Sequence, residues 1–194
     1  MDFFKRHCNR VGASQEQIDR IFDSNLGINI GRLSRCFEDW VTILTSLGIC
    51  NRSANDRYYS AEICAKLFSA VTGISMESED IVKAADRIWT TTRAINVREG
   101  FSKKDDTIPN QWFEPLQLSD GEHVMRDYFG NKVLEREDIE KWRDDYYSDR
   151  GWDLQYGIPT NDRLVALGID DVAADMIKYR EKVVRQKVRD GSEE

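Results

Sequence analysis

The placement of proline constrains this chain more than any other feature of its sequence. All three prolines, Pro109, Pro115 and Pro159, lie in the second half. Because proline lacks a backbone N–H and interrupts a helix interior, the first 108 residues can form helices without a break. Apolar residues recur at helical spacing, and we find no strand-like alternation anywhere in the sequence. The pattern therefore predicts an all-α, multi-helix domain.

Capping and stop signals divide the first half into four helices. Ser14–Gln17 fits a capping box, and Ser60 is a second N-cap candidate. Glycines just past a periodic segment are typical helix stops. The remaining boundaries are expected near Gly31, Gly48, Gly73, Ser75 and Gly100. The residues expected to face inward are Ile18, Ile21 and Phe22; Leu33, Cys36, Phe37, Trp40, Val41, Leu44 and Leu47; Ile63, Leu67, Phe68 and Val71; and Ile81, Ala85, Ile88 and Ile95.

Residues 100–133 break the helical pattern, because neither the helical nor the strand period persists there. We expect one long internal loop that is either functional or packed by its own Trp112 and Phe113. Helical spacing then returns from Glu135 to about Gly151, from Thr160 to Gly168, and from Asp170 onward. We expect one domain over 1–194, or helical parts 1–99 and 134–190 joined by the 100–133 loop.

Charge and hydropathy exclude two classes of partner. The chain has 35 acidic and 28 basic residues, a net charge of -7, which argues against binding to nucleic-acid phosphates. No apolar run approaches the length of a membrane span. The first residues, Met1–Arg6, are too polar for a signal peptide, so we expect a soluble cytoplasmic protein.

The four cysteines form no obvious metal site. Cys8, Cys36, Cys50 and Cys64 are too far apart for a CxxC pair, and in a reducing cytosol free thiols or metal ligands are favoured over disulfides. Cys36 and Cys64 fall on apolar helix faces, which is typical of core residues. Cys50 differs because it follows a helix stop and is expected in a loop.

The segment 135–153 carries eight acids and four bases at helical spacing. We interpret it as the solvated face of a helix in preference to a metal-binding carboxylate cluster. No phosphate-binding glycine loop and no nucleophile elbow are present, so the residues alone identify no general acid or base.

Three segments, 46–50 (SLGIC), 96–109 (NVREGFSKKDDTIP) and 146–160 (YYSDRGWDLQYGIPT), resemble motifs of the aldehyde ferredoxin oxidoreductases. Residues 96–109 are similar to the NxREGFxxxDDxxP stretch of that family. Residues 146–160 resemble its YYxxRGWDxxGxPT ending, and residues 46–50 match its SLGxC motif. Order and spacing agree from about residue 33 to 170, which corresponds to only the C-terminal third of a family member.

The resemblance implies cofactors that this chain holds only in part. Family members contain a tungsten, or sometimes molybdenum, bis-pterin and one [4Fe–4S] cluster, and they oxidise aldehydes to carboxylic acids with ferredoxin as electron acceptor. The resemblance assigns Cys50 as one metal ligand. The remaining cofactor-binding residues that it implies are Thr45, Leu47, Gly48 and Ile49. Thr45 stands where the family usually has an aspartate that binds a pterin, and a hydroxyl binds more weakly than a carboxylate.

The other cofactor elements of the family are absent from this sequence. It has neither the CxxCxxxC motif nor the pterin-cradling β domain. We therefore expect the C-terminal portion of such an oxidoreductase, inactive and without cofactors when isolated, whose partners are the remaining domains or subunits, ferredoxin and an aldehyde. The alternatives are the catalytic subunit of an ATP-independent benzoyl-CoA reductase and a non-catalytic helical interaction module.

The resemblance also offers a role for the 100–133 loop as a channel wall or a contact to other domains. The plainer interpretation is structural and is the one we favour. Arg98 and Glu99 can pair with each other, and Asp105 with Asp106 before Pro109 suits a turn.

Overall fold

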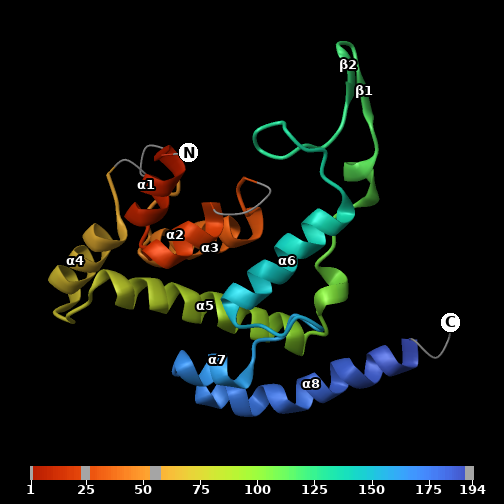
Figure 1. The fold of residues 1–194 in the computed structure, drawn as a ribbon. Coiled ribbons are helices and arrows are strands. Elements are labelled where there is room, and N and C mark those ends of the chain that lie inside the picture. The colour runs from red at the N-terminus through yellow and green to blue at the C-terminus, as the bar shows by residue number, and fades with distance from the viewer. Residues whose placement is uncertain (1, 23–26, 53–57, 191–194) are drawn as a thin grey trace.

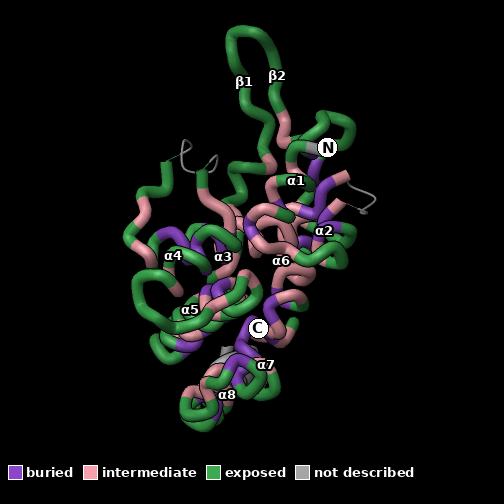
Figure 2. The backbone as a smooth tube through the Cα atoms, turned by 90° about the vertical axis from the view of Figure 1, so that its left-hand side faces the viewer, coloured by how far each residue is buried: buried purple, intermediate pink, exposed green. Residues whose placement is uncertain are grey.

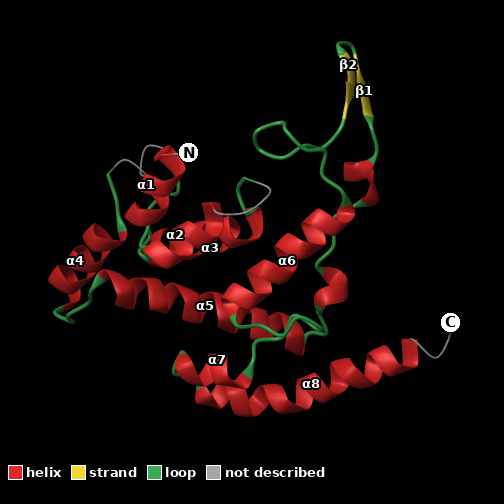
Figure 3. Cartoon of the chain, viewed as in Figure 1, coloured by secondary structure: helices red, strands yellow, loops and turns green. Residues whose placement is uncertain are grey.

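The computed structural model describes residues 2–22, 27–52 and 58–190 of the 194-residue chain. The predicted all-α class is confirmed, since helices dominate the described residues and the named strands form a single two-stranded sheet (Figure 3). The α-helices are α1 (Asp2–Arg10), α2 (Gln15–Phe22), α3 (Ile30–Ser46), α4 (Ala61–Thr72), α5 (Ser78–Arg98), α6 (Arg136–Arg150), α7 (Asn161–Ala166) and α8 (Asp170–Asp190).

Most of the predicted helix boundaries are confirmed. Ser14 and Gln17 exchange hydrogen bonds as a capping box, and the Ser60 hydroxyl accepts from the Ile63 N–H. Gly73 ends α4 in the left-handed conformation at φ 74°. The helix expected from Ser75 begins later, because the side chains of Glu77 and Asp80 form the box that caps α5.

Helices α3 and α5 form the centre of the fold. The two helices pack against each other, with α4 on α5, α6 on α3, and the α7–α8 pair beyond α5 (Figure 1). Within the described residues, no helix has the length and hydropathy needed to cross a bilayer.

The predicted inward face of α4 is confirmed at Cys64, which is fully buried, and is wrong at three of its large apolar residues. Ile63, Leu67 and Val71 are 41%, 46% and 85% exposed. The buried side instead carries the small residues Ala61, Cys64 and Ala65, which pack against Trp40, Ile43, Leu44, Ile81 and Ala85. Small residues let α4 approach its neighbours closely, so the large apolar side chains remain on the outer face.

The predicted face of α5 is correct at Ile81 and Ala85 and wrong at Ile88 and Ile95, which are about half exposed. The buried side of α5 is largely polar in its middle. It presents Asp86, Thr90 and Arg93. The spacing of apolar residues cannot identify a helix face whose buried side chains are polar or charged.

The 100–133 segment is more ordered than a plain loop. It contains two short 3₁₀ turns, η2 (Lys103–Asp105) and η3 (Asn110–Phe113). Strands β1 (Leu116–Leu118) and β2 (Gly121–His123) form an antiparallel hairpin, which contradicts the expected absence of strands. The hairpin projects from the body and is exposed on both faces (Figure 2), so no one-sided burial imposes the apolar alternation that would signal it.

The interpretation of residues 135–153 as a solvated face holds for Glu135, Glu137, Glu140 and Lys141, which are exposed, and is wrong for the second half of the helix. Arg150 of α6 is fully buried. Its guanidinium binds Asp39 at 2.6 Å, Glu38 at 2.9 Å and Asp86 at 3.1 Å, which joins α6 to both α3 and α5. Further ion pairs of the same kind connect Arg32 with Asp145 and Asp149, Arg20 with Asp149, and Arg35 and Arg163 with Asp86.

This ion network accounts for part of the motif at 146–160. Desolvation raises the pKa of Asp39, while Arg150 and Arg35 oppose that change. Burial disfavours the charge of Arg150, yet its pKa is raised because Asp39, Tyr146 and Glu38 favour the cation. Within the motif, Asp149 and Arg150 hold helices together, and Asp153 accepts from the Tyr156 and Ile158 N–H groups.

Candidate functional site

The SLGxC segment forms an ordered helix end. Gly48, at φ 69°, donates its N–H to the Thr45 carbonyl, and Ile49 donates to the Leu44 carbonyl. This pairing is a Schellman motif. Leu47 and Ile49 are half-buried and pack on the core around α3, whereas Thr45, Gly48 and Cys50 are exposed. The structure therefore confirms that Cys50 lies in a loop and leaves its ligand role as a prediction.

Among the described residues, Cys50 suits one ligand position of an iron–sulfur cluster, and the other ligands of a complete site are not found beside it. A [4Fe–4S] cluster takes four thiolates. No group of three or more His, Cys, Asp or Glu residues with metal-binding geometry occurs within residues 2–22, 27–52 and 58–190. The exposed Cys50 thiol on its anchored loop suits a single ligand whose companions come from another part of an enzyme.

The other three cysteines are packed. Cys64 is fully buried, and burial raises the pKa of its thiol. Cys8 of α1 is buried against the half-buried Cys36 of α3. Their mutual hydrogen bond raises the pKa of Cys36 and lowers that of Cys8.

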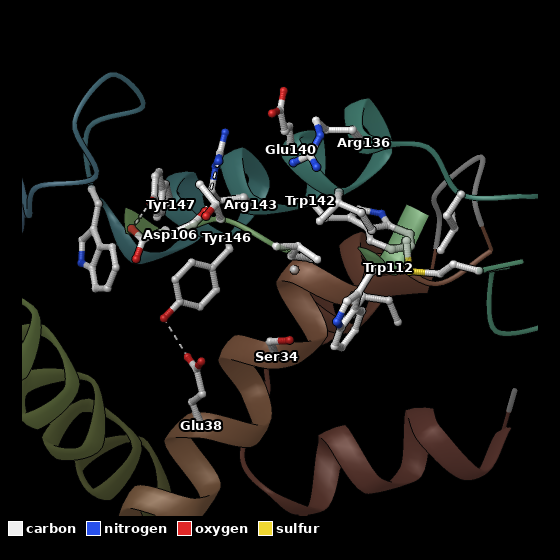
Figure 4. Close-up of a pocket in the computed structure, with 18 of the residues that line it drawn as sticks. Ser34, Glu38, Asp106, Trp112, Arg136, Glu140, Trp142, Arg143, Tyr146 and Tyr147 are labelled. Atoms are coloured by element: carbon white, nitrogen blue, oxygen red, sulfur yellow. Dashed lines mark hydrogen bonds between the residues drawn. The ribbon is translucent and has the colours of Figure 1, made fainter. Parts of the chain in front are cut away.

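A pocket of about 730 Å³ lies between α3, α5, α6 and the segment 106–113 (Figure 4). We call it the aromatic pocket. Seven of its lining residues are aromatic: Trp89, Trp112, Phe113, Trp142, Tyr146, Tyr147 and Trp152. Sequence periodicity did not predict this site, because its walls come from segments far apart in the sequence.

One polar group of the pocket centres on Asp106. Its carboxylate accepts from both terminal nitrogens of Arg93, at 3.0 and 2.5 Å, and from the Tyr147 hydroxyl. Burial raises the pKa of Tyr147, and the hydrogen bond to Asp106 raises it further. Asp106 is therefore more than a turn residue, because it fixes the 100–113 segment to α5 and α6.

A second polar group centres on Tyr146. Its hydroxyl donates to Glu38 at 2.8 Å (Figure 4) and also accepts from the Trp89 indole N–H at 2.7 Å. Glu38 also accepts from Arg150, so the pocket wall connects directly to the buried ion network. Burial is the main cause of the raised pKa of Tyr146.

The aromatic pocket and Cys50 occupy different ends of α3. The pocket uses Ile30, Gly31, Ser34 and Glu38, whereas Cys50 follows the last turn. At about 1.5 Å per residue, the helix from Ser34 to Ser46 spans roughly 18 Å. The structure therefore does not bring the predicted cofactor-binding residues into the pocket.

The structure also clarifies the 96–109 motif. Arg98 pairs with Glu99 at 3.2 Å, as expected, and both are exposed. Asp105 accepts from the Ser102 N–H and caps the η2 turn. Asp106, Thr107 and Ile108 line the aromatic pocket, so this segment does form the wall of a cavity.

The chain is similar to known proteins both in sequence and in structure. Residues 5–169 match the family model described as aldehyde ferredoxin oxidoreductase, domains 2 and 3. The tungsten-containing aldehyde ferredoxin oxidoreductase of Pyrococcus furiosus is 28% identical over 134 residues, covering 69% of this chain and 20% of that protein. The Thermococcus kodakarensis protein of the same name is 27% identical over 136 residues, with the same coverage. The chain thus spans about a fifth of the length of these relatives.

A solved structure has the same fold. It is the active-site complex BamBC of benzoyl coenzyme A reductase in complex with 1,5-dienoyl-CoA. Its TM-score is 0.60 at 24% identity, and the match covers 88% of this chain and 25% of that one. Since the family model matches most of the sequence, the chain belongs to the aldehyde ferredoxin oxidoreductase family, in the region of its domains 2 and 3.

Proposed function

We propose that this chain is the C-terminal portion of a tungsten-pterin, [4Fe–4S] oxidoreductase that oxidises aldehydes to carboxylic acids. The observation that carries the proposal is the family match over residues 5–169, which includes the SLGxC segment. The exposed Cys50 on a fixed helix end supports it, because a ligand shared with another domain must reach the surface.

In this proposal Cys50 supplies one thiolate to the cluster, and the remaining three come from outside the chain. The exposed Thr45 on the last turn of α3 offers a hydroxyl to a pterin, with Leu47, Gly48 and Ile49 shaping the surface beside it. The tungsten, or molybdenum, with its pterins supplies the two-electron oxidation of the aldehyde carbon. Ferredoxin takes the electrons, and the enzyme works in the cytoplasm.

The exposed apolar face of α4 supports assembly with other domains or subunits. Ile63, Leu67 and Val71 follow one another at helical spacing, and the same helix is the first that the structure describes after Cys50. An unpartnered apolar stripe is typical of a surface that another chain or domain covers. Because the remaining cofactor elements lie elsewhere, the isolated chain is inactive and holds no cofactor.

The fold of the benzoyl coenzyme A reductase complex supports a second candidate, in which the complete enzyme reduces an aromatic acyl thioester. A third candidate is a helical interaction module without cofactors, for which Thr45 at the usual aspartate position is the supporting feature. The three candidates differ in metal content and in substrate.

The test is purification of this chain from its native source together with whatever it binds. We expect co-purifying domains with a CxxCxxxC motif, about one tungsten and four iron atoms per assembly, and viologen reduction that depends on an aldehyde. Reduction of benzoyl-CoA without aldehyde oxidation would favour the second candidate. An assembly without tungsten, molybdenum or iron would favour the module.

Cysteine variants of the assembled enzyme test the role of Cys50. Cys50→Ser is expected to remove the cluster's paramagnetic signal, since serine is a poor substitute for a thiolate ligand. Cys64→Ser is the matched control, because Cys64 is fully buried in the helical core and should change only stability. A normal cluster in Cys50→Ser would contradict the assignment.

A further inference from the structure

We propose that the aromatic pocket is a binding site for a small organic anion with a flat aromatic body, such as an aryl carboxylate. The inference concerns residues of this chain alone and does not require the cofactors. Its basis is the combination of seven aromatic lining residues with three arginines of the pocket that donate their hydrogen bonds to neutral oxygens.

The walls provide flat apolar surfaces on two sides. Trp112, from the segment after Pro109, lies opposite Trp142 of α6 (Figure 4). Trp142 is almost completely buried, whereas Trp112 is 59% exposed at the mouth. A planar ring entering between α6 and this segment would contact aromatic side chains, and such contacts favour an aromatic ring over a saturated one of similar size.

Two acidic residues of the pocket are already neutralised. Asp106 receives two hydrogen bonds from Arg93, and Glu38 receives one from Arg150. Both carboxylates are therefore engaged by arginines other than Arg126, Arg136 and Arg143. The third acid, Glu140, forms no ion pair with Arg136 or Arg143 in the described part of the chain.

Three other arginines of the pocket donate to neutral oxygens. Arg143 donates to the Asp106 backbone carbonyl, and Arg126 donates to the Gly130 carbonyl. Arg136 donates to the Asn110 side-chain amide and stacks on the Phe113 ring. The nearest carboxylate to any of these guanidinium groups is Asp144, 3.6 Å from the Arg143 Nε.

Charge complementarity therefore favours an anion in the pocket. A chain with a net charge of -7 concentrates three weakly paired guanidinium groups around one apolar cavity. Arginine matches the planar geometry of a carboxylate, which it can bind through two parallel hydrogen bonds. The volume of about 730 Å³ lies within the range of small-molecule sites and exceeds the needs of a single ion.

The test uses the intrinsic fluorescence of the full chain. Trp89, Trp112, Trp142 and Trp152 line the pocket, and Trp40 is packed in the core, so four of five tryptophans report on occupancy. Phenylacetate is the probe, with calorimetry as a second measurement. We expect a saturable fluorescence change, and weaker binding of both 2-phenylethanol, which lacks the charge, and cyclohexylacetate, which lacks the aromatic ring.

Two variants assign the binding to the pocket. Arg136→Gln removes one charge and is expected to weaken phenylacetate binding roughly tenfold, the scale of one charge-assisted hydrogen bond. Trp112→Leu removes an exposed wall residue without disturbing the core and should also weaken binding. Arg185→Gln on α8 is the control, since Arg185 is exposed and lies outside the pocket. Circular dichroism checks that each variant is folded.

Several outcomes would overturn the proposal. One is the absence of saturable binding up to about 10 mM phenylacetate, a concentration at which the binding free energy would be weaker than about 3 kcal/mol. Another is equal binding of the charged and the neutral probe. Binding that is unchanged in both Arg136→Gln and Trp112→Leu would place the ligand elsewhere. Each of these results leaves the metal content of the native assembly, and hence the proposed function, untouched.

Discussion

Gly31 of α3 lies directly against the backbone of Trp142 in α6. A Cβ atom built on Gly31 would stand 1.9 Å from the Trp142 carbonyl oxygen. The two helices can therefore approach this closely only because residue 31 has no side chain. The contact sits at the wall of the aromatic pocket, since both residues line it.

Gly31→Ala is expected to destabilise the protein by about 2 kcal/mol or more, because the added methyl group must push α3 away from α6. The direction of the change in unfolding free energy is informative, since replacing glycine by alanine within a helix otherwise stabilises a protein by roughly 0.5–1 kcal/mol. Urea denaturation followed by circular dichroism measures the free energy of unfolding.

Gly73→Ala is the matched control. Gly73 ends α4 with φ 74°, and nothing lies within 4 Å of a Cβ built there. Only the strain of the left-handed conformation remains, about 1–2 kcal/mol. A stabilised Gly31→Ala protein would show that the α3–α6 contact is wider than the structure describes.

Arg150→Met is expected to lower the free energy of unfolding by about 3–5 kcal/mol, because it leaves buried carboxylates without their main cation. This decrease in the free energy of unfolding should become smaller toward acid pH. Burial raises the pKa of Asp39, and without Arg150 that carboxyl would take up a proton more readily still.

Arg185→Met is the control for the loss of an arginine. Arg185 pairs with Glu181 on α8, and its side chain is 78% exposed. Such a pair contributes about 0.5 kcal/mol or less. Equal effects at positions 150 and 185 would refute a structural role for the buried network.

Helix boundaries were predictable because caps and stops are local signals. Ser60 and Gly73 act through hydrogen bonds and backbone angles within one turn, so the sequence alone indicates where α4 begins and ends. Which face of α4 is buried depends on the other helices. Cys64 was correctly assigned to the core, but its small neighbours Ala61 and Ala65 were missed, and Val71 was wrongly placed inside.

The site was less predictable than the fold. Family resemblance identified Cys50, whereas periodicity gave no hint of the aromatic pocket. Tyr146 and Asp106 line it from segments forty residues apart, and only the folded chain shows that both face one cavity. The burial of charged residues was also not predicted. From the sequence alone, Arg150 looks like any solvated helix residue, and only its partners on α3 and α5 show that it is buried.

Tyr146 is expected to lower the stability of the folded chain at alkaline pH. Burial raises its pKa above the ordinary value of 10.0. Above pH 10 the unfolded chain releases this proton while the folded chain keeps it, so the free energy of unfolding should fall as pH rises. The expected slope is about 1.4 kcal/mol per pH unit for each such group. Tyrosinate absorbance during alkaline titration, with parallel denaturation curves, measures both effects.

In Tyr146→Phe, the fall of the free energy of unfolding above pH 10 should be smaller by the contribution of one ionising group, about 1.4 kcal/mol per pH unit. Tyr58→Phe is the control for loss of a tyrosine hydroxyl, since the Tyr58 side chain is 72% exposed. An unaltered slope in Tyr146→Phe would mean that the Tyr146 hydroxyl ionises normally in the folded chain.

Cys50 is expected to react with a thiol reagent such as dithionitrobenzoate much faster than the other cysteines. It is exposed in the loop after α3, whereas Cys8 and Cys64 are 1% and 0% exposed and must wait for local opening of the helices. Time-resolved release of the chromophore from the native chain should show one fast phase equivalent to one thiol.

Assignment of the fast phase requires two variants. Cys50→Ser should abolish it and leave the slow phases unchanged, because Cys50 is exposed and contributes little to packing. Cys64→Ser should keep the fast phase and accelerate the slow ones, since a hydroxyl in place of the buried thiol destabilises the contact between α4 and α5. If the fast phase persists in Cys50→Ser, the loop shields that thiol, and a ligand role toward an outside cluster would require the loop to rearrange first.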